Sequence, residues 1–104
     1  MADNERYPLH PGRVLLEEIL LPMGLSQYRL ARDLNVPIPR INAIVHGKRA
    51  ISADTALRLA RYFETPERFW IDLQVAYDLD MAKMKLGDGL EQEIPVLATQ
   101  RMVE

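Results

Sequence analysis

The sequence lacks cysteine and has few other residues suited to catalysis or metal binding. With no Cys among 104 residues, a disulfide framework, a thiolate metal site and a cysteine nucleophile are all excluded. The only two histidines, His10 and His46, are not spaced for a zinc site on one helix. Gly87-Asp88-Gly89 lacks the strand and helix context of a phosphate loop, and Ser26 and Ser52 are better explained as helix caps than as nucleophiles. We expect no cofactor, no metal and no enzymatic activity.

Long apolar runs are also lacking. Hydrophobic residues make up 48% of the chain and charged residues 27%, which is ordinary for a globular protein. No stretch approaches the roughly 20 apolar residues that a membrane-spanning helix needs. The polar residues 1–6 are not followed by the apolar stretch of a secretory signal. We therefore expect a single-domain, cytoplasmic protein that has no membrane partner.

The charged residues are unevenly distributed along the chain. A net charge of −2 is unusual for a protein that binds nucleic acid. However, residues 24–61 carry seven basic residues against two acidic ones, and residues 62–104 carry four against nine. One alternative is chance clustering in a short chain. The distribution otherwise predicts a basic binding face, at about +5, backed by an acidic region.

Apolar residues recur at helical spacing, which predicts an all-α protein with five helices. The first begins at Pro11, lasts about ten residues and is ended by Pro22 and Gly24. Caps and breakers bound the other four: residues 27–34 after the Ser26 cap, a third helix from about Pro37 to Gly47, a fourth from the Ser52 cap to Phe63, and a fifth from the Thr65 cap and Pro66 to about Leu86.

The pattern also predicts how the chain is divided. We expect a flexible arm at 1–9, a DNA-binding unit at 10–64, a C-terminal helix at 65–86 and a tail at 87–104. The tail should contain a turn at 87–89, a short extended piece at 93–97 and disorder from 99 onward. In the fourth helix the predicted buried residues are Ala56, Leu57, Leu59, Ala60 and Phe63.

The fifth helix carries two apolar stripes rather than one. We call Phe69, Trp70, Leu73, Tyr77, Met81 and Met84 the core stripe. We call Ile71, Val75, Leu79, Ala82 and Leu86 the second stripe, with Gln74 among the polar residues that separate the two. A monomer needs only one stripe. The second one predicts a dimer interface through Ile71, Val75, Leu79 and Ala82, unless the C-terminal tail folds back over it.

The second and third helices, separated by a tight break at residues 35–37, have the layout of a helix-turn-helix. The third helix has an apolar back, and its other side carries the candidates for reading bases in the major groove, which are Arg40, Asn42, Pro39, Ile38 and Ala43. Four residues near the ends of the two helices are expected to contact phosphates, namely Gln27, Ser26, Lys48 and Arg49. Arg29, Arg32, Arg58 and Arg61 are expected to contribute only a general positive field.

Several short segments carry a family resemblance. Leu25-Ser26-Gln27, Leu34-Asn35-Val36 and Gly47-Lys48-Arg49 resemble the Cro and phage-repressor-like class of helix-turn-helix domains. His10-Pro11-Gly12 and Phe69-Trp70-Ile71-Asp72-Leu73-Gln74 narrow the similarity to HigA-type antitoxins. The resemblance spans about residues 9–80. It implies a five-helix, lambda-repressor-like fold with an extended C-terminal helix and a short tail.

The resemblance also implies a function. HigA-type antitoxins act as homodimers that bind an inverted repeat in double-stranded operator DNA, repress their own operon and sequester a HigB-type toxin, a small mRNA-cleaving ribonuclease of RelE-like fold. Pro37 and Pro39 are unusual at the start of a recognition helix in this class. Two other functions stay open: a free-standing transcriptional regulator that has no toxin partner, and a protein-binding adaptor that has lost DNA binding.

Overall fold

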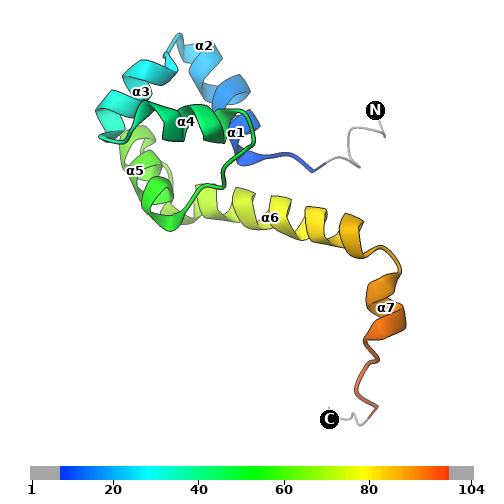
Figure 1. Cartoon of the computed structure of the whole chain (residues 1–104). Helices are drawn as coiled ribbons and strands as arrows, with labels where there is room; N and C mark the ends of the chain where they lie inside the picture. Colours follow the sequence, from blue (N-terminus) through cyan, green and yellow to red (C-terminus); the bar gives the residue numbers. More distant parts are fainter. Residues whose placement is uncertain (1–7, 99–104) are drawn as a thin grey trace.

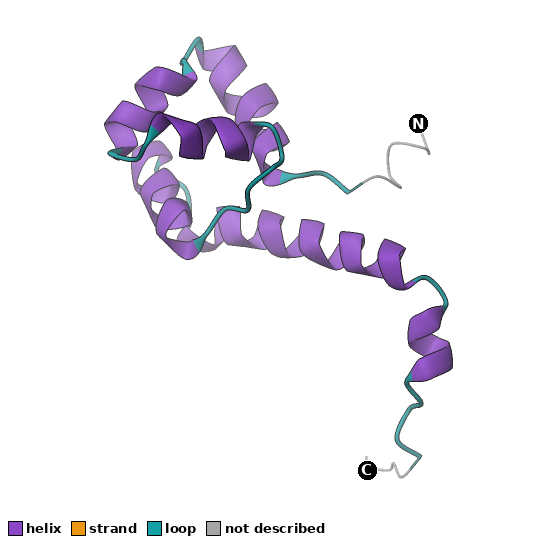
Figure 2. Ribbon diagram, in the orientation of Figure 1, coloured by secondary structure: helices purple, strands orange, loops and turns teal. Residues whose placement is uncertain are grey.

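The computed structural model describes residues 8–98. The expected flexibility of residues 1–7 and disorder of residues 99–104 therefore lie outside the described residues. Within residues 8–98 every regular element is a helix (Figure 2). In chain order these are α1 Pro11–Val14, the π-helix η2 Leu15–Leu20, α2 Leu21–Met23, α3 Gln27–Leu34, α4 Ile38–Val45, α5 Ala53–Phe63, α6 Glu67–Leu86 and α7 Gly89–Glu93 (Figure 1).

The first helix is longer than predicted because it continues through Pro22. The segments α1, η2 and α2 follow one another without a break and end at Gly24, which has a left-handed φ of 65°. The wider π-helical turn, in which the Leu21 N–H bonds to the Leu16 carbonyl, precedes the proline. Proline lacks an N–H and its ring crowds the preceding turn, so a local widening lets the helix include it. Gly24 therefore ends this helix, as predicted, and Pro22 does not.

The boundaries of α3, α4 and α5 confirm the predicted caps. Ser26 Oγ accepts a hydrogen bond from the Arg29 N–H at 2.9 Å, and Ser52 Oγ accepts one from the Thr55 N–H at 3.3 Å. Helix α4 begins directly after Pro37 and is followed by Gly47, which has a φ of 74°. Because these signals act within one turn of the chain, they can be identified from local sequence alone.

The core lies where the first helix, α3, α4, α5 and the start of α6 meet. Its largest fully buried side chains include Trp70, Leu15, Leu20, Leu30, Ile41, Ile44 and Leu59. Removing each large apolar side chain from water contributes about 1.5–3 kcal/mol to folding. In α5 the buried side is narrower than predicted. Leu57 is 51% exposed, because it faces an open groove between α5 and α6 instead of the core.

Gly12 allows the first helix to pack closely against α4. A Cβ atom at this position would lie 1.8 Å from the Ile44 carbonyl oxygen, so no other residue fits without moving α1 away from α4. The Gly12 N–H donates to His10 Nδ1 at 2.9 Å, which makes His10 the N-cap of α1. The His10 ring packs edge-on against Tyr77, at 4.8 Å between centroids, and so connects the first helix to α6.

Helix α6 packs on the core only through its first half and then projects away from it (Figure 1). It begins one residue later than predicted, with Pro66 rather than Thr65 at the N-cap. Trp70 is buried, but Met81 and Met84 of the core stripe are exposed because the core ends before them. Gln74, predicted as a polar border residue, is buried instead. It is needed there because its Oε1 accepts a hydrogen bond from the Ile51 N–H at 2.8 Å.

The tail differs from the prediction. A short helix, α7, follows the turn at Gly87, whereas we expected only a turn and an extended piece. Residues after it, such as Ile94 and Val96, are exposed at 61% and 92%. The second stripe remains exposed as well, with Val75 at 47% and Leu79 at 54%. The tail therefore does not cover the second stripe in residues 8–98. None of the described helices is long and apolar enough to cross a membrane.

Candidate nucleic-acid interface

Helices α3 and α4 form a pair joined by a tight turn at one end of the molecule (Figure 1). Asn35 makes the turn in a left-handed conformation, with a φ of 61°, and its N–H bonds to the Ala31 and Arg32 carbonyls at the end of α3. Asn accepts this conformation more readily than most residues do. Pro37 then restricts the residue before it to an extended conformation, and α4 starts directly after it. The turn is thus determined by three consecutive residues.

The exposed side of α4 carries most of the residues predicted to read bases. Ile41, Ile44 and Val45 are buried. Ile38 is 44% exposed, Pro39 and Asn42 are exposed, and Ala43 is half-buried. The helix therefore presents a mixed face of apolar and amide groups of the kind that can contact thymine methyl groups and adenine edges.

The predicted base-reading Asn42 is paired with a residue predicted to contact phosphate. Asn42 Nδ2 donates to Gln27 Oε1 at 3.3 Å, across the gap between α4 and α3. Both lie near the positive N-terminal end of α3, where backbone N–H groups can meet a phosphate. We predicted Asn42 as a base reader and Gln27 as a phosphate contact, and the structure joins the two by a hydrogen bond.

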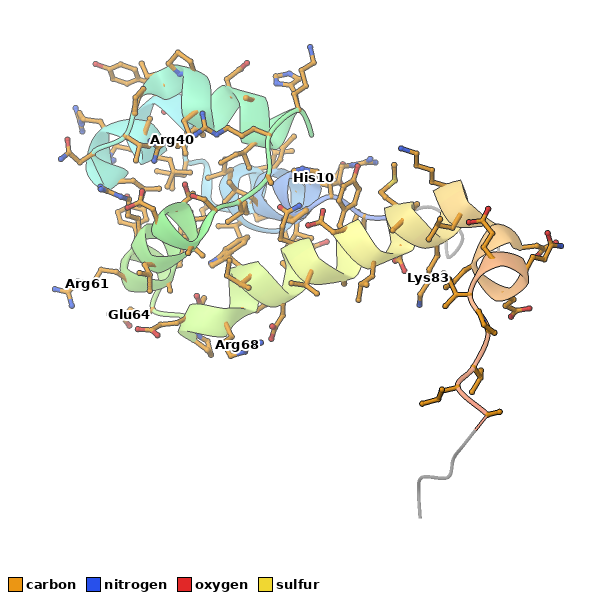
Figure 3. All side chains as sticks on the ribbon, turned by 60° about the horizontal axis from the view of Figure 1, so that its bottom comes forward. His10, Arg40, Arg61, Glu64, Arg68 and Lys83 are labelled. Carbon is orange, nitrogen blue, oxygen red and sulfur yellow. The ribbon has the colours of Figure 1, made fainter. Side chains whose placement is uncertain are left out.

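Arg40 makes an ion pair within the protein instead of extending freely into solvent. Its Nη1 atom lies 3.1 Å from Asp54 Oδ2 in α5, and its side chain is only 24% exposed. Figure 3 shows Arg40 at the side of α4 that faces α5. We predicted Arg40 as a base reader from its place on α4. Its pairing with Asp54 was not predicted, because the two residues are 14 positions apart.

Arg58 makes hydrogen bonds within the protein that the sequence did not predict. Its Nη1 atom donates to the Leu34 carbonyl at 2.8 Å and contacts the Asn35 carbonyl at 3.4 Å. Its Nε atom donates to Asp54 at 3.0 Å. Arg58 therefore holds the turn between α3 and α4 against α5 by satisfying carbonyls that the helix end leaves unpaired.

The remaining residues predicted to contact phosphates lie at the ends of the pair. The Ser26 hydroxyl caps α3, and Lys48 and Arg49 are exposed just after α4. The Lys48 N–H bonds to the Ala43 carbonyl, so the backbone of this segment is held against the end of α4. Two basic side chains thus project from an ordered backbone beside the exposed side of α4.

Two acidic side chains in this region have lowered pKa values. The pKa of Asp54 lies below its usual 3.8, first because of the hydrogen bond from Arg58 and then because of attraction to Arg58 and Arg40. The pKa of Asp33 is lowered first by the hydrogen bond from the Tyr62 hydroxyl, at 2.5 Å, and then by Arg29. Both carboxylates therefore remain charged at neutral pH and bind α5 to α3 and α4.

A second candidate surface lies on α6 and next to α5. Val75, Leu79 and Ala82 of the second stripe are exposed, and Ile71 is half-buried at the edge of the core. Ile71 also lines a largely apolar groove of about 210 Å³ between the two helices, together with Ala53, Ala56, Leu57, Glu67 and Arg68. The described part of the chain contains no group of three or more acidic or histidine side chains that could hold a metal ion.

Comparison with known proteins places these features in context. The family described as helix-turn-helix matches residues 16–70. The chain is 48% identical to virulence-associated protein I of Dichelobacter nodosus, over 97% of this chain and 93% of that protein. It is similar to the Pseudomonas aeruginosa antitoxin HigA solved with the higBA promoter, with a TM-score of 0.83, 46% identity, and 86% and 99% of the two chains covered. It is also similar to the antitoxin GraA solved in complex with its operator, with a TM-score of 0.82, 41% identity, and 86% and 91% covered.

Proposed function

This chain belongs to the helix-turn-helix family, among its HigA-type members, and on that premise we propose that it is an antitoxin. It binds its own operator as a homodimer, represses its operon and neutralises a HigB-type toxin by direct binding. The observation that carries the DNA-binding part is the exposed side of α4, which has Asn42 held by Gln27 and two basic residues at its end.

The proposed contacts to bases and to phosphates come from different parts of α3 and α4. Arg40, Asn42, Ile38, Pro39 and Ala43 read base edges, because they lie along or beside the exposed side of α4. Phosphate contacts from the ends of α3 and α4 orient the protein without selecting a sequence. These contacts come from Ser26, Gln27, Lys48 and Arg49.

Specificity requires two copies. One recognition helix reads only a few base pairs, so a dimer must place two such helices about 34 Å apart on an inverted repeat. The second stripe supports a dimer built on α6 because Val75 and Leu79 are exposed and aligned one turn apart. We assign the interface to Ile71, Val75, Leu79 and Ala82, in the 65–86 helix. The 10–64 unit contacts DNA.

The DNA-binding part is tested with the purified protein and two labelled duplexes, one with its own promoter and one with the same bases scrambled. We expect tighter binding to the promoter, with an affinity that falls steeply between 50 and 200 mM salt because counterions are released as phosphates are neutralised. Equal binding to both duplexes would contradict sequence-specific binding. The absence of salt-dependent binding would favour an adaptor that has lost DNA contact.

The antitoxin part is tested by co-expression with the gene that lies beside it. We expect the two proteins to co-purify, and we expect the neighbouring protein alone to arrest growth. A free-standing regulator is the alternative, since relatives include proteins named only as helix-turn-helix transcriptional regulators. The absence of a small basic neighbour, together with harmless deletion of this gene, would favour that alternative.

A further inference from the structure

We propose that Asp54 is a positioning residue that fixes the Arg40 guanidinium for base reading. This inference rests on the proposed operator binding and adds a specificity-determining residue outside α4. Asp54 lies in the first turn of α5, and it contacts a predicted base reader through an interaction between two helices.

The geometry leaves Arg40 few ways to approach DNA. Its Nη1 atom is held by Asp54 at 3.1 Å. Its Nε atom is buried and has no hydrogen-bond partner among the described residues. A guanidinium can present either its Nε side or its Nη end to an acceptor pair. Since the Nε atom is buried, Arg40 must read a base with its Nη end, which is the end that Asp54 orients.

Asp54 is itself held in place. The same Oδ2 atom accepts from Arg58 Nε at 3.0 Å, and Arg58 Nη1 donates to the Leu34 carbonyl at 2.8 Å. A continuous chain of contacts therefore runs from the turn between α3 and α4, through Arg58 and Asp54, to Arg40. The position of the guanidinium is thus tied to the turn that sets the direction of α4.

This arrangement has a favourable and an unfavourable effect on DNA binding. An arginine held in one orientation loses less conformational freedom when it binds a base, which favours the operator. A carboxylate that is 58% exposed beside the DNA-facing surface repels phosphates, which weakens binding to every sequence. Asp54 therefore lowers the affinity for DNA of any sequence and raises the preference for the operator. These two effects can be separated by experiment.

The test uses the full chain with Asp54→Asn, which keeps the shape of the side chain and removes its charge. We expect binding to scrambled DNA to rise about twofold, because a repulsive charge is lost. We expect the ratio of operator to scrambled affinity to fall roughly fivefold to twentyfold, within the range given by one arginine–guanine contact. Glu17→Gln, which removes a carboxylate paired with Arg13 in the first helix, is the matched control and should leave the ratio unchanged.

A double-mutant cycle with Arg40→Ala identifies the route of the effect. If Asp54 acts through Arg40, the Asp54→Asn change should lower the affinity ratio in the wild-type background and leave it unchanged in the Arg40→Ala background. Thermal unfolding of the same four proteins separates this result from a loss of fold. Asp54→Glu adds a test of position, because it keeps the charge but moves the carboxylate; it should also lower the ratio.

Three outcomes would overturn the inference. These are an unchanged or increased affinity ratio in Asp54→Asn, equal effects of Asp54→Asn in both backgrounds, and full discrimination by Asp54→Glu. The wild-type protein distinguishes this failure from failure of the proposed function. If the wild type prefers the operator and Asp54→Asn does so equally, only the role of Asp54 is wrong. If the wild type shows no preference, the proposed operator binding is itself wrong.

Discussion

Residues 26–58 and residues 71–86 differ in how their exposed side chains are held. In the first region, Asn42, Arg40 and Arg58 form hydrogen bonds or ion pairs that cross between helices. In the second region, on α6, apolar side chains such as Val75 and Leu79 are exposed at 47% and 54%. The polar side chains of the first region are therefore held by contacts within one chain, whereas the second region has an exposed apolar surface of the kind that marks protein contact sites.

The largest effect should come from disrupting the packing of the first helix against α4 in the first region. Gly12→Ala places a Cβ atom against the Ile44 carbonyl and must push the first helix away from α4. We expect the free energy of unfolding to fall by about 3 kcal/mol, as measured by urea denaturation. Gly89→Ala is the matched control, because a Cβ atom added at Gly89 would lie 3.8 Å from its nearest neighbour, Glu93 Oε2. Equal stability of the two variants would show that α1 moves without cost.

The next largest effect should come from the second stripe. Val75→Asp places a charge in the proposed interface, so we expect a monomer by sedimentation equilibrium and an operator affinity reduced by at least about 100-fold, since joining two binding modules contributes on this scale. Leu90→Asp makes the same change on α7 and should leave the dimer intact. An unchanged dimer in Val75→Asp would move the interface to another surface.

Arg40→Ala should have a smaller effect that is selective for sequence. We expect a loss of about 1–3 kcal/mol of discrimination between operator and scrambled DNA, while non-specific binding is retained. Fluorescence anisotropy with the two duplexes measures both quantities. Equal loss on both duplexes would identify Arg40 as a phosphate contact instead.

Lys48→Ala should weaken binding to both duplexes by a similar factor of a few. Its side chain is exposed at the end of α4 and is proposed to neutralise one phosphate. The slope of log affinity against log salt should therefore decrease in magnitude by about 1. A change confined to the operator would show that Lys48 reads sequence.

The smallest effect should be a dependence of stability on pH through His10. Burial lowers the pKa of His10 below its usual 6.5, while the Arg49 backbone and Asp78 oppose this shift. A lowered pKa means that the neutral ring is favoured in the fold. The contribution of His10 to the free energy of unfolding is therefore fully present above pH 6.5. It declines as the pH falls from 6.5 through the folded pKa.

Urea denaturation at pH 8 and pH 5 measures this dependence. His10→Asn keeps a side chain that can cap α1 but removes the titrating ring, so it should show a smaller decline between the two pH values. His46→Asn, at an exposed position, is the control, and its stability should decline as that of the wild type does. An equal decline in all three proteins would assign the pH dependence to other groups.

Much of the helix-turn-helix could be predicted because its signals are local. The caps at Ser26 and Ser52 and the break at Pro37 each act within a few residues, and all three define helix starts in the structure. The inclusion of Pro22 in the first helix could not be predicted in this way, because the π-helical turn before it breaks the usual spacing. The exposure of Leu57 depends on where α6 packs, which periodicity within α5 does not show.

The candidate site was predicted less completely. The side of α4 that carries Asn42 follows from helical spacing, and the structure exposes it as expected. The contacts that hold Arg40 and the turn come from Asp54 and Arg58, which are 14 and 24 residues from their partners. Pairings at such separations leave no periodic signal in one sequence. The sequence carries one local sign of these contacts, which is the spacing of four residues between Asp54 and Arg58 in α5.

The buried amide of Gln74 connects the two regions. Its Oε1 accepts from the Ile51 N–H, just after the basic segment that follows α4, and its Nε2 donates to Asp78, where α6 leaves the core. In a dimer built on α6, the angle of this joint sets how far apart the two α4 helices stand. The distance between the two α4 helices would then be fixed by the protein. An operator with one base pair inserted between its half-sites would not fit that distance.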